Sequence, residues 1–306
     1  MTRKLMSLPE AIQRFVPDGA TVLMGAALES LIPFAAGHEI MRQGRGDLTL
    51  VGPISDILFD QLVGGGCVRG VIAAWVGNVS AGLGHNYRRA AEEGIPRRIE
   101  IRDHSNLSLA LALQAGALGV PFIPTKTLLG TDLLKTNPTL REWTVPWTGD
   151  RFVLVPALQP DVAILHVQRA DSGGAAHCWG NLGVSVEASL ASHHLILIAE
   201  EIVSAEVIRS DPNRVLVPPF KVRAVVHEPY GAHPSPVQGY YNRDHAFYHE
   251  YHLATRTVEG FAAWAKHWIF DLPSRTAYLE KLGSTRVADL GVRQHRWAAP
   301  VDYGYS

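Results

Sequence analysis

Short strand-like runs alternate with amphipathic segments along the first part of the chain. The strand-like runs lie at 21–26, 47–52, 68–75, 97–104 and 121–126, and helical patterns lie between them near 31–43, 55–64, 85–93 and 106–117. Strands that alternate with helices are typical of βαβ units, whose strands pair in parallel. This half of the chain therefore predicts an α/β fold with an open, largely parallel sheet and helices on both faces.

Four later runs extend the same pattern. They lie at 151–158, 161–170, 194–202 and 222–229 and are almost continuously apolar, as are strands that are covered on both faces. We expect one sheet system to run to about residue 230, and helices at 257–270 and 274–282 to pack onto it. The segment 293–306 is interpreted as an ordered or partner-contacting tail. The prediction is a single domain over residues 1–306, with a C-terminal helical extension over about 243–306.

Glycine-rich or polar turns follow four of the predicted strands. They read "MGAALES" at 24–30, "VGPIS" at 51–55, "WVGNVSAGLG" at 75–84 and "DHSNL" at 103–107. Any one of these can be an ordinary turn, in which glycine supplies an unusual backbone angle. In parallel sheets, however, ligands bind beyond the carboxyl ends of the strands, where helix N-termini supply free amides. Four such turns predict a shared cleft at this edge.

Composition narrows the class of ligand. The 306 residues are 47% hydrophobic and 19% charged, with a formal net charge of −1, so there is no basic field for nucleic acid. No run approaches the roughly 18 apolar residues that cross a bilayer. We expect a cytoplasmic protein with small-molecule partners and no membrane contact. Cys67 and Cys178 are too few for a disulfide framework or thiolate metal site and are interpreted as core thiols.

Several familiar motifs are missing or incomplete. The sequence has no GxGxxG after a first strand, no GxxxxGK[ST] and no GxSxG, so dinucleotide, nucleotide-phosphate and serine-hydrolase functions lose support. His245, His249 and His252 have a spacing that could present imidazoles to a metal on one helical face. An aromatic-rich helix that packs on a subunit or on the sheet explains them equally well, and we expect no metal.

Two further groups of residues leave two interpretations open. Glu200 and Glu201 end an apolar strand, so their carboxylates point to opposite sides and only one can face a cleft. A structural role, with a carboxylate bonded to backbone or to an arginine, is favoured over acid–base work. In "HEPYGAHPSP" at 227–236, Tyr230 and His233 could line a site, although a rigid loop is the default interpretation.

Longer stretches carry a family resemblance. "QPDVAILHVQRADSGG", "IAEEIVSAEVIRSDP", "VVHEPYGAHPSPVQGYY" and "WIFDLPSRTAYLEKLGSTR" resemble the α subunit of class I coenzyme A transferases, most closely that of the glutaconate CoA-transferases. The likeness covers nearly the whole chain. It implies the family's α/β fold, no bound cofactor, and a coenzyme A thioester as substrate.

The resemblance also implies a site. In 3-oxoacid members a glutamine amide in the oxyanion hole occupies the position of Asn106, which is the catalytic candidate here; the alternative is that Asn106 chiefly caps the following helix. The family's Gly-Gly-Phe turn corresponds to Gly25-Ala26-Ala27. Small polar residues of the turns would orient an acyl carboxylate, and glycines would allow close backbone approach. The expected substrate-binding set is Gly25, Ala26, Gly52, Ser55, Asn78, Ser80 and Ser105.

The resemblance further implies a partner. In two-subunit members the nucleophilic glutamate lies in the β subunit, in a Glu-Asn-Gly-like or Ser-Glu-like context, and no glutamate here has that setting. We therefore expect an α2β2 assembly that moves CoA between an acyl-CoA and a carboxylic acid. The alternatives are a subunit of a CoA-thioester decarboxylase or of a ring-opening hydrolase, although the hydrolases carry Glu where Asn106 stands. A non-catalytic ligand-binding protein is a third alternative, without an appended DNA-binding motif to support it.

Overall fold

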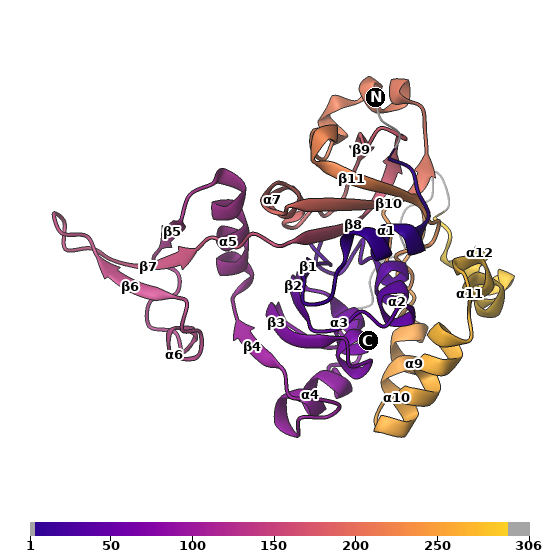
Figure 1. The fold of residues 1–306 in the computed structure, drawn as a ribbon, viewed down its shortest axis with the longest axis horizontal. Coiled ribbons are helices and arrows are strands. Elements are labelled where there is room, and N and C mark those ends of the chain that lie inside the picture. Colours follow the sequence, from indigo (N-terminus) through magenta and orange to yellow (C-terminus); the bar gives the residue numbers. More distant parts are fainter. Residues whose placement is uncertain (1–3, 293–306) are drawn as a thin grey trace, which may run out of the picture.

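A seven-stranded parallel sheet forms the centre of the molecule (Figure 1). The computed structural model describes residues 4–292. The sheet order is β11-β10-β8-β1-β2-β3-β4, and a short strand, β9 (Ala176–His177), pairs antiparallel with β8. The parallel strands are β1 (Thr21–Leu23), β2 (Leu48–Ile54), β3 (Val68–Trp75), β4 (Glu100–Asp103), β8 (Val162–Ala170), β10 (His194–Ile202) and β11 (Val222–His227). The predicted α/β class with a largely parallel sheet is confirmed.

Alternate residues of the strands point into two separate cores, because successive side chains of a strand face opposite sides. In β10, Ile196 and Ile198 belong to one core, and Leu195 and Leu197 to the other. The first core is covered by α1 (Leu8–Phe15), α2 (Phe34–Arg42), α3 (Asp56–Gly64) and α4 (His85–Glu92). The second is covered by α5 (Asn106–Leu118) and α7 (Ser185–Ala191). Helices therefore lie on both faces, as expected.

Two predicted strands are not in the parallel sheet. β5 (Phe122–Thr125), β6 (Arg141–Thr144) and β7 (Arg151–Pro156) form a separate antiparallel sheet in the order β5-β7-β6, and Figure 1 shows it projecting from the main body. The expectation of one continuous sheet system was therefore wrong. The apolar run of β7 resembles a strand covered on both faces, but β7 is buried only at alternate positions, Val153 and Val155. We call residues 122–156 the projecting unit, which includes α6 (Leu133–Thr136).

From residue 245 the chain is helical, as predicted for 257–270 and 274–282. The elements are α9 (His245–Ala254), α10 (Val258–Ala265), the π-helix η3 (Lys266–Phe270), α11 (Arg275–Leu282) and α12 (Ser284–Leu290). Phe247, Tyr248 and Tyr251 of α9 are buried in the first core. The predicted tail at 293–306 lies outside the described residues. The remaining short elements are α8 (Ala205–Ser210), η1 (Pro212–Arg214) and η2 (Pro219–Lys221).

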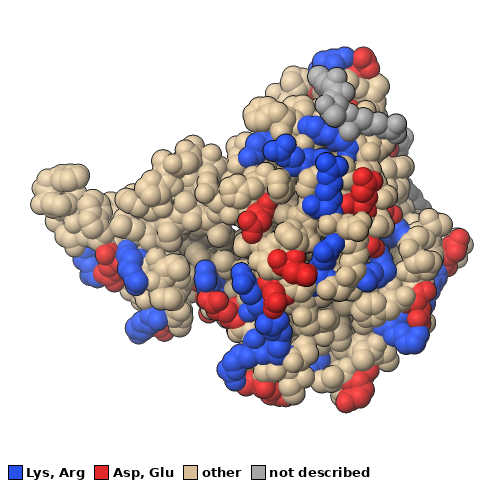
Figure 2. Space-filling view, viewed as in Figure 1, with Lys and Arg blue, Asp and Glu red and all other residues tan. Residues whose placement is uncertain are grey.

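The visible surface carries charges of both signs, and the two thiols are buried. Among residues 4–292, no helix is both long and apolar enough to cross a membrane. Figure 2 shows Lys and Arg interspersed with Asp and Glu on the visible face. Cys67 and Cys178 are buried and unbonded to each other, as predicted, and burial raises the pKa of the Cys67 thiol to about 11.

Candidate active site at the carboxyl edge of the sheet

Of the five non-glycine residues with positive φ angles among residues 4–292, four lie at the carboxyl ends of parallel strands; the fifth, Asp47, precedes β2. Leu28 and Leu31 follow β1, Asp56 follows β2 and Tyr230 follows β11, and all four have positive φ angles, of 64°, 55°, 46° and 57°. A residue other than glycine in this region costs about 1–3 kcal/mol and persists where the surroundings enforce it, often at functional sites. The strain supports the carboxyl edge as the functional edge.

The turns after β1 and β2 are packed against each other. The Ser55 hydroxyl donates to the Met24 carbonyl at 2.9 Å. A Cβ atom on Gly25 would lie 2.4 Å from Ser55 Oγ, and one on Gly52 would lie 2.4 Å from the Met24 carbonyl oxygen. The structure therefore brings Gly25, Gly52 and Ser55 together, and both positions require glycine. Ser55 is only 1% exposed, so its hydroxyl holds the two turns together.

Ala26 lies beneath the loop that leads into α7. Its carbonyl oxygen accepts the Val184 N–H at 2.9 Å, and a Cβ atom on Gly183 would lie 2.2 Å from that oxygen. Ala26 is 1% exposed. This carbonyl is thus committed to the fold, and a substrate-binding role for Ala26 would have to use another atom.

Asn78 and Ser80 are held to α9. The fully buried Asn78 amide donates to the Tyr248 carbonyl at 2.8 Å, and Asn78 Oδ1 accepts the N–H groups of Ser80 and Ala81. Ser80 Oγ accepts from the Arg243 guanidinium at 3.1 Å. Asn78 therefore shapes the loop after β3, and Ser80 is the residue of the pair that is partly exposed.

Arg243 and Asp56 were missed from the sequence. The Arg243 guanidinium forms an ion pair with the buried Asp56 carboxylate and lies 3.8 Å from the Tyr248 ring centroid. Asp56 also accepts the Val79 N–H at 3.1 Å. Burial raises the pKa of the Asp56 carboxyl, although Arg243 opposes that shift. The pair joins the turns after β2 and β3. Only the "SD" pair after β2 could have indicated Asp56, since Arg243 is 187 residues away.

Asn106 begins α5, but it does not cap the helix. Ser105 is the N-cap: its hydroxyl accepts the Ser108 N–H at 3.0 Å, and Ser108 Oγ reciprocally accepts the Ser105 N–H at 2.9 Å. Asn106 is exposed. Within residues 4–292, the side-chain amide of Asn106 has no hydrogen-bond partner. The backbone N–H groups of Asn106 and Leu107 have none there either. The capping alternative for Asn106 is therefore wrong, and three donors are left open at this helix end.

The predicted site residues thus form separate groups. Gly25, Gly52 and Ser55 are in contact, and Asn78 belongs to the loop that α9 holds against the first core. Asn106 starts α5, whose Leu109 and Leu113 belong to the second core. Both loops follow neighbouring strands, since Ala73 of β3 is paired with Asp103 of β4. That Asn78 and Asn106 line one cleft stays a prediction.

Glu200 and Glu201 have the structural roles that the sequence favoured. The buried Glu200 carboxylate is bonded to His166 Nε2 at 2.6 Å, the Tyr241 hydroxyl at 2.7 Å and the Tyr230 N–H at 2.8 Å. Burial by itself raises the pKa of Glu200, but these hydrogen bonds outweigh it and the pKa is lowered. Glu201 pairs with Arg169 at 3.1 Å near the surface.

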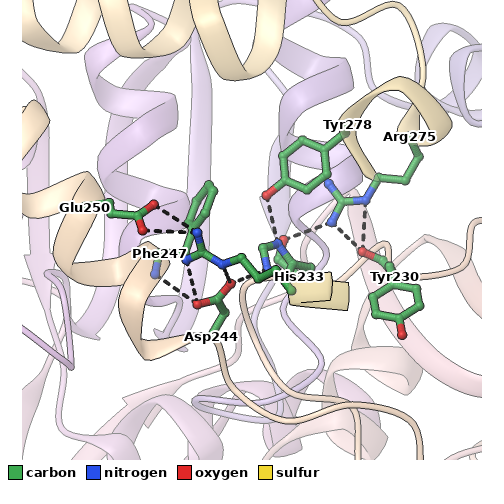
Figure 3. Close-up of polar contacts among 8 residues, drawn as sticks. Tyr230, His233, Asp244, Phe247, Glu250, Arg275 and Tyr278 are labelled. Atoms are coloured by element: carbon green, nitrogen blue, oxygen red, sulfur yellow. Dashed lines mark hydrogen bonds and ion pairs between the residues drawn. The ribbon is translucent and has the colours of Figure 1, made fainter. Parts of the chain in front are cut away.

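Hydrogen bonds hold the loop at 227–236, which we call the clamp, to residues of the C-terminal helices (Figure 3). His233 is fully buried, with Nδ1 2.8 Å from the Tyr278 hydroxyl and Nε2 3.0 Å from Asp244 Oδ2. Burial lowers the pKa of His233 to about 4. The Arg275 guanidinium donates to the carbonyls of Tyr230 and His233. The clamp joins the sheet edge to α9 and α11.

The histidines of α9 are separated by their contacts. His245 Nδ1 lies 3.2 Å from Ser80 Oγ, while the His252 ring packs on His85 at a centroid distance of 4.6 Å. His249 is exposed. Within the part of the chain that the structure describes, no group of three or more His, Cys, Asp or Glu side chains is arranged to hold a metal ion. The helix-packing interpretation accounts for these contacts.

A parallel α/β sheet with strained, glycine-dependent turns and an unpaired helix N-terminus at its carboxyl edge has the arrangement in which open α/β folds bind small molecules. The family described as "Coenzyme A transferase" matches residues 5–228, so the chain belongs to the coenzyme A transferase family.

Individual relatives cover almost the whole chain. The chain is 42% identical to the A subunit of the 3-oxoadipate CoA-transferase of Pseudomonas knackmussii, over 87% of this chain and 93% of the relative. It is 35% identical to the A subunit of the glutaconate CoA-transferase of Acidaminococcus fermentans, over 94% and 95%. The crystal structure of that transferase superimposes with a TM-score of 0.90 over 95% of this chain and 96% of the other. A variant of the decarboxylase AibA/AibB is similar with a TM-score of 0.73 and 28% identity, over 86% and 99%.

The different environments of the two adjacent glutamates give a matched test of stability. Glu200→Ala should lower the free energy of unfolding by about 3–5 kcal/mol, because it leaves His166, the Tyr241 hydroxyl and the Tyr230 N–H buried without their partner. Glu201→Ala should cost at most about 1 kcal/mol, because its ion pair with Arg169 is partly solvated. Urea unfolding of both variants measures this difference. Equal losses would contradict the assignment.

Proposed function

We propose that this chain is the α subunit of a two-subunit enzyme that moves CoA from an acyl-CoA to a dicarboxylic acid. The observation that carries the proposal is the relationship to two A subunits whose names specify dicarboxylic acids, 3-oxoadipate and glutaconate, over 87% and 94% of this chain. The open donors at the N-terminus of α5 support it, because acyl transfer requires donors for a developing oxyanion.

In the proposed reaction, the thioester carbonyl of the acyl-CoA is attacked by a glutamate carboxylate of the β subunit. Collapse of the tetrahedral intermediate breaks the C–S bond and gives an acyl-glutamyl anhydride and CoA thiolate. The thiolate then attacks the glutamyl carbonyl, which releases the first acid and forms a glutamyl-CoA thioester. The acceptor acid repeats the two steps in reverse order, and the glutamate is regenerated. Covalent catalysis thus divides one difficult exchange into easier steps.

Residues of this chain would donate hydrogen bonds to the oxyanions. Asn106 would donate from its side-chain amide, and the free N–H groups of the first turn of α5 would add the positive end of the helix dipole. A single donor of this kind contributes about 2.7–4 kcal/mol in other acyl-transfer sites. The residues of the turns after β1, β2 and β3 would shape the carboxylate pocket, with Gly25 and Gly52 allowing the turns to approach each other.

The second candidate function is that of a decarboxylase or ring-opening hydrolase component that acts on a CoA thioester. The 28% identity to the AibA/AibB decarboxylase supports it. The β-subunit gene distinguishes the two: a glutamate in the expected nucleophile motif favours transfer, and its replacement favours decarboxylation or hydrolysis.

Substitution of Asn106 tests the oxyanion role without disturbing the helix cap. In the reconstituted enzyme, Asn106→Ala should lower kcat about 100-fold or more, because it removes a transition-state donor. Asn106→Asp should lose as much, since it keeps the side-chain shape but replaces the donor by an acceptor. The same charge is favourable at a helix N-terminus, so melting temperature should not fall. Asn106→Gln, which restores an amide, should retain more activity than either. Full turnover in the Asp variant would contradict the oxyanion role.

Activity should require pairing with a β subunit. The chain purified alone should show no CoA exchange between an acyl-CoA and a free acid, since it lacks the nucleophile. Co-expression with the β chain, expected to be encoded next to it, should give an α2β2 complex by light scattering and restore exchange. Exchange at full rate by the chain alone would contradict this.

A further inference from the structure

His104 connects the last residue of β4 to the cap of α5. The side chain is buried, and both ring nitrogens have partners: Nδ1 lies 3.0 Å from Ser108 Oγ, and Nε2 lies 3.2 Å from Asn137 Nδ2. Asn137 is fully buried and comes from the projecting unit, between α6 and β6. Asn137 of the projecting unit is therefore connected to Ser108, in the first turn of α5, through the His104 imidazole.

The contacts of Asn137 determine the tautomer of His104. Asn137 Oδ1 accepts from the N–H and hydroxyl of Thr139, at 3.0 and 2.7 Å, so the amide nitrogen faces the other way. That nitrogen donates to the Asp103 carbonyl at 2.9 Å and, with its second hydrogen, to His104 Nε2. Because Nε2 accepts, the proton of the neutral ring is on Nδ1. Burial lowers the pKa of His104 to about 4, so the ring is neutral near pH 7.

The Nδ1–H group completes the bonding of Ser108. Ser108 Oγ accepts from His104 and from the Ser105 N–H, and it donates to the Ser105 carbonyl at 3.2 Å. Its three roles are consistent only if the imidazole donates. The N–H and the carbonyl of Ser105 are thereby both bonded to Ser108 Oγ. Asn106 is the next residue. The His104 tautomer thus determines whether the imidazole donates to Ser108 Oγ, the atom that bonds both the N–H and the carbonyl of Ser105.

We propose that His104, held as the Nδ1–H tautomer by Asn137, is a positioning residue that aims the Asn106 amide at the oxyanion. This inference rests on the proposed function. His104 does not touch the reacting atoms. It acts through Ser108 and Ser105, and it makes the projecting unit part of the active-site support. A misplacement of about 1 Å in such a site can cost about 100-fold in rate.

The surroundings give the imidazole room to move if a partner is lost. A cavity of about 90 Å³ adjoins the ring and is lined by Ile72, Arg102, Ala112, Thr139 and Pro156, among others. Rotation of the ring into this space would remove the donor from Ser108. The network, rather than close packing on every side, keeps the ring in place.

Two substitutions of His104 separate the two ring nitrogens. Asparagine places an amide donor near the position of Nδ1, whereas glutamine places its amide near Nε2. His104→Gln should therefore lower kcat by between about 10-fold and 100-fold with little change in KM. His104→Asn should retain most of the wild-type kcat. A merely structural role predicts that both variants lose stability together, without this split in kcat. Equal kcat in wild type and both variants would overturn the proposal.

Asn137→Asp reverses the polarity of the relay. An aspartate only accepts, so the neutral ring would carry its proton on Nε2 and leave Nδ1 without one; kcat, measured above the pKa of the imidazole in this variant, should fall as in His104→Gln. The ¹⁵N chemical shifts of the His104 ring report the tautomer directly, and the wild-type protein in its complex should show Nδ1–H. An Nε2–H tautomer in the wild type would overturn the proposal even if no variant folded.

The Asn106 variants distinguish the possible failures. If Asn106→Ala loses turnover while His104→Gln and Asn137→Asp keep it, the positioning role is wrong and the proposed function stands. If Asn106→Ala keeps full turnover, the oxyanion role itself fails. In the double variant Asn106→Ala, His104→Gln, the two effects should be less than multiplicative, because both act on one donor.

Discussion

A parallel sheet of seven strands with helices on both faces imposes the constraint on which the site depends. Each strand must be followed by a crossover, so all seven carboxyl ends and several helix N-termini gather at one edge. At that edge Gly25 and Gly52 let two turns approach, and Ser55 bonds one turn to the other. The strained backbone of Leu28, Leu31 and Asp56 occurs in the same turns. The architecture therefore places the buried, closely packed turns after β1 and β2 at the same sheet edge as the unpaired donors that begin α5.

At the start of α5, the residues that cap the helix differ from the residue that is free to bind a ligand. A helix needs a cap, and a polar residue used as a cap is not free to bind a ligand. Here Ser105 and Ser108 form the capping box, and His104 and Asn137 complete its hydrogen bonds. Asn106 is thereby left exposed with an unused amide. The polar stretch "DHSN" thus contains the cap, Ser105, its support, His104, and the candidate donor, Asn106, while Asp103 contributes its backbone carbonyl to Asn137.

Sequence patterns predicted the main strands and helices because burial on both faces leaves long apolar runs. The run at 68–75 became β3 without change. The same patterns failed for 151–156, where Phe152 and Leu154 are apolar although only Val153 and Val155 are fully buried, so an edge unit resembled a central strand. The candidate turns could be predicted from glycine and serine. Arg243 and Asn137 could not, because their partners are distant in sequence and no local pattern reports such contacts.

The central claim is that Asn106 donates to the oxyanion of acyl transfer. A crystal structure of the reconstituted complex, trapped as the β-subunit glutamyl-CoA thioester, tests it most directly. The account predicts Asn106 Nδ2 within about 2.7–3.2 Å of the thioester carbonyl oxygen, with the Ser105–Ser108 cap unchanged. A thioester oxygen bound by other donors, with the Asn106 amide turned to solvent, would contradict it.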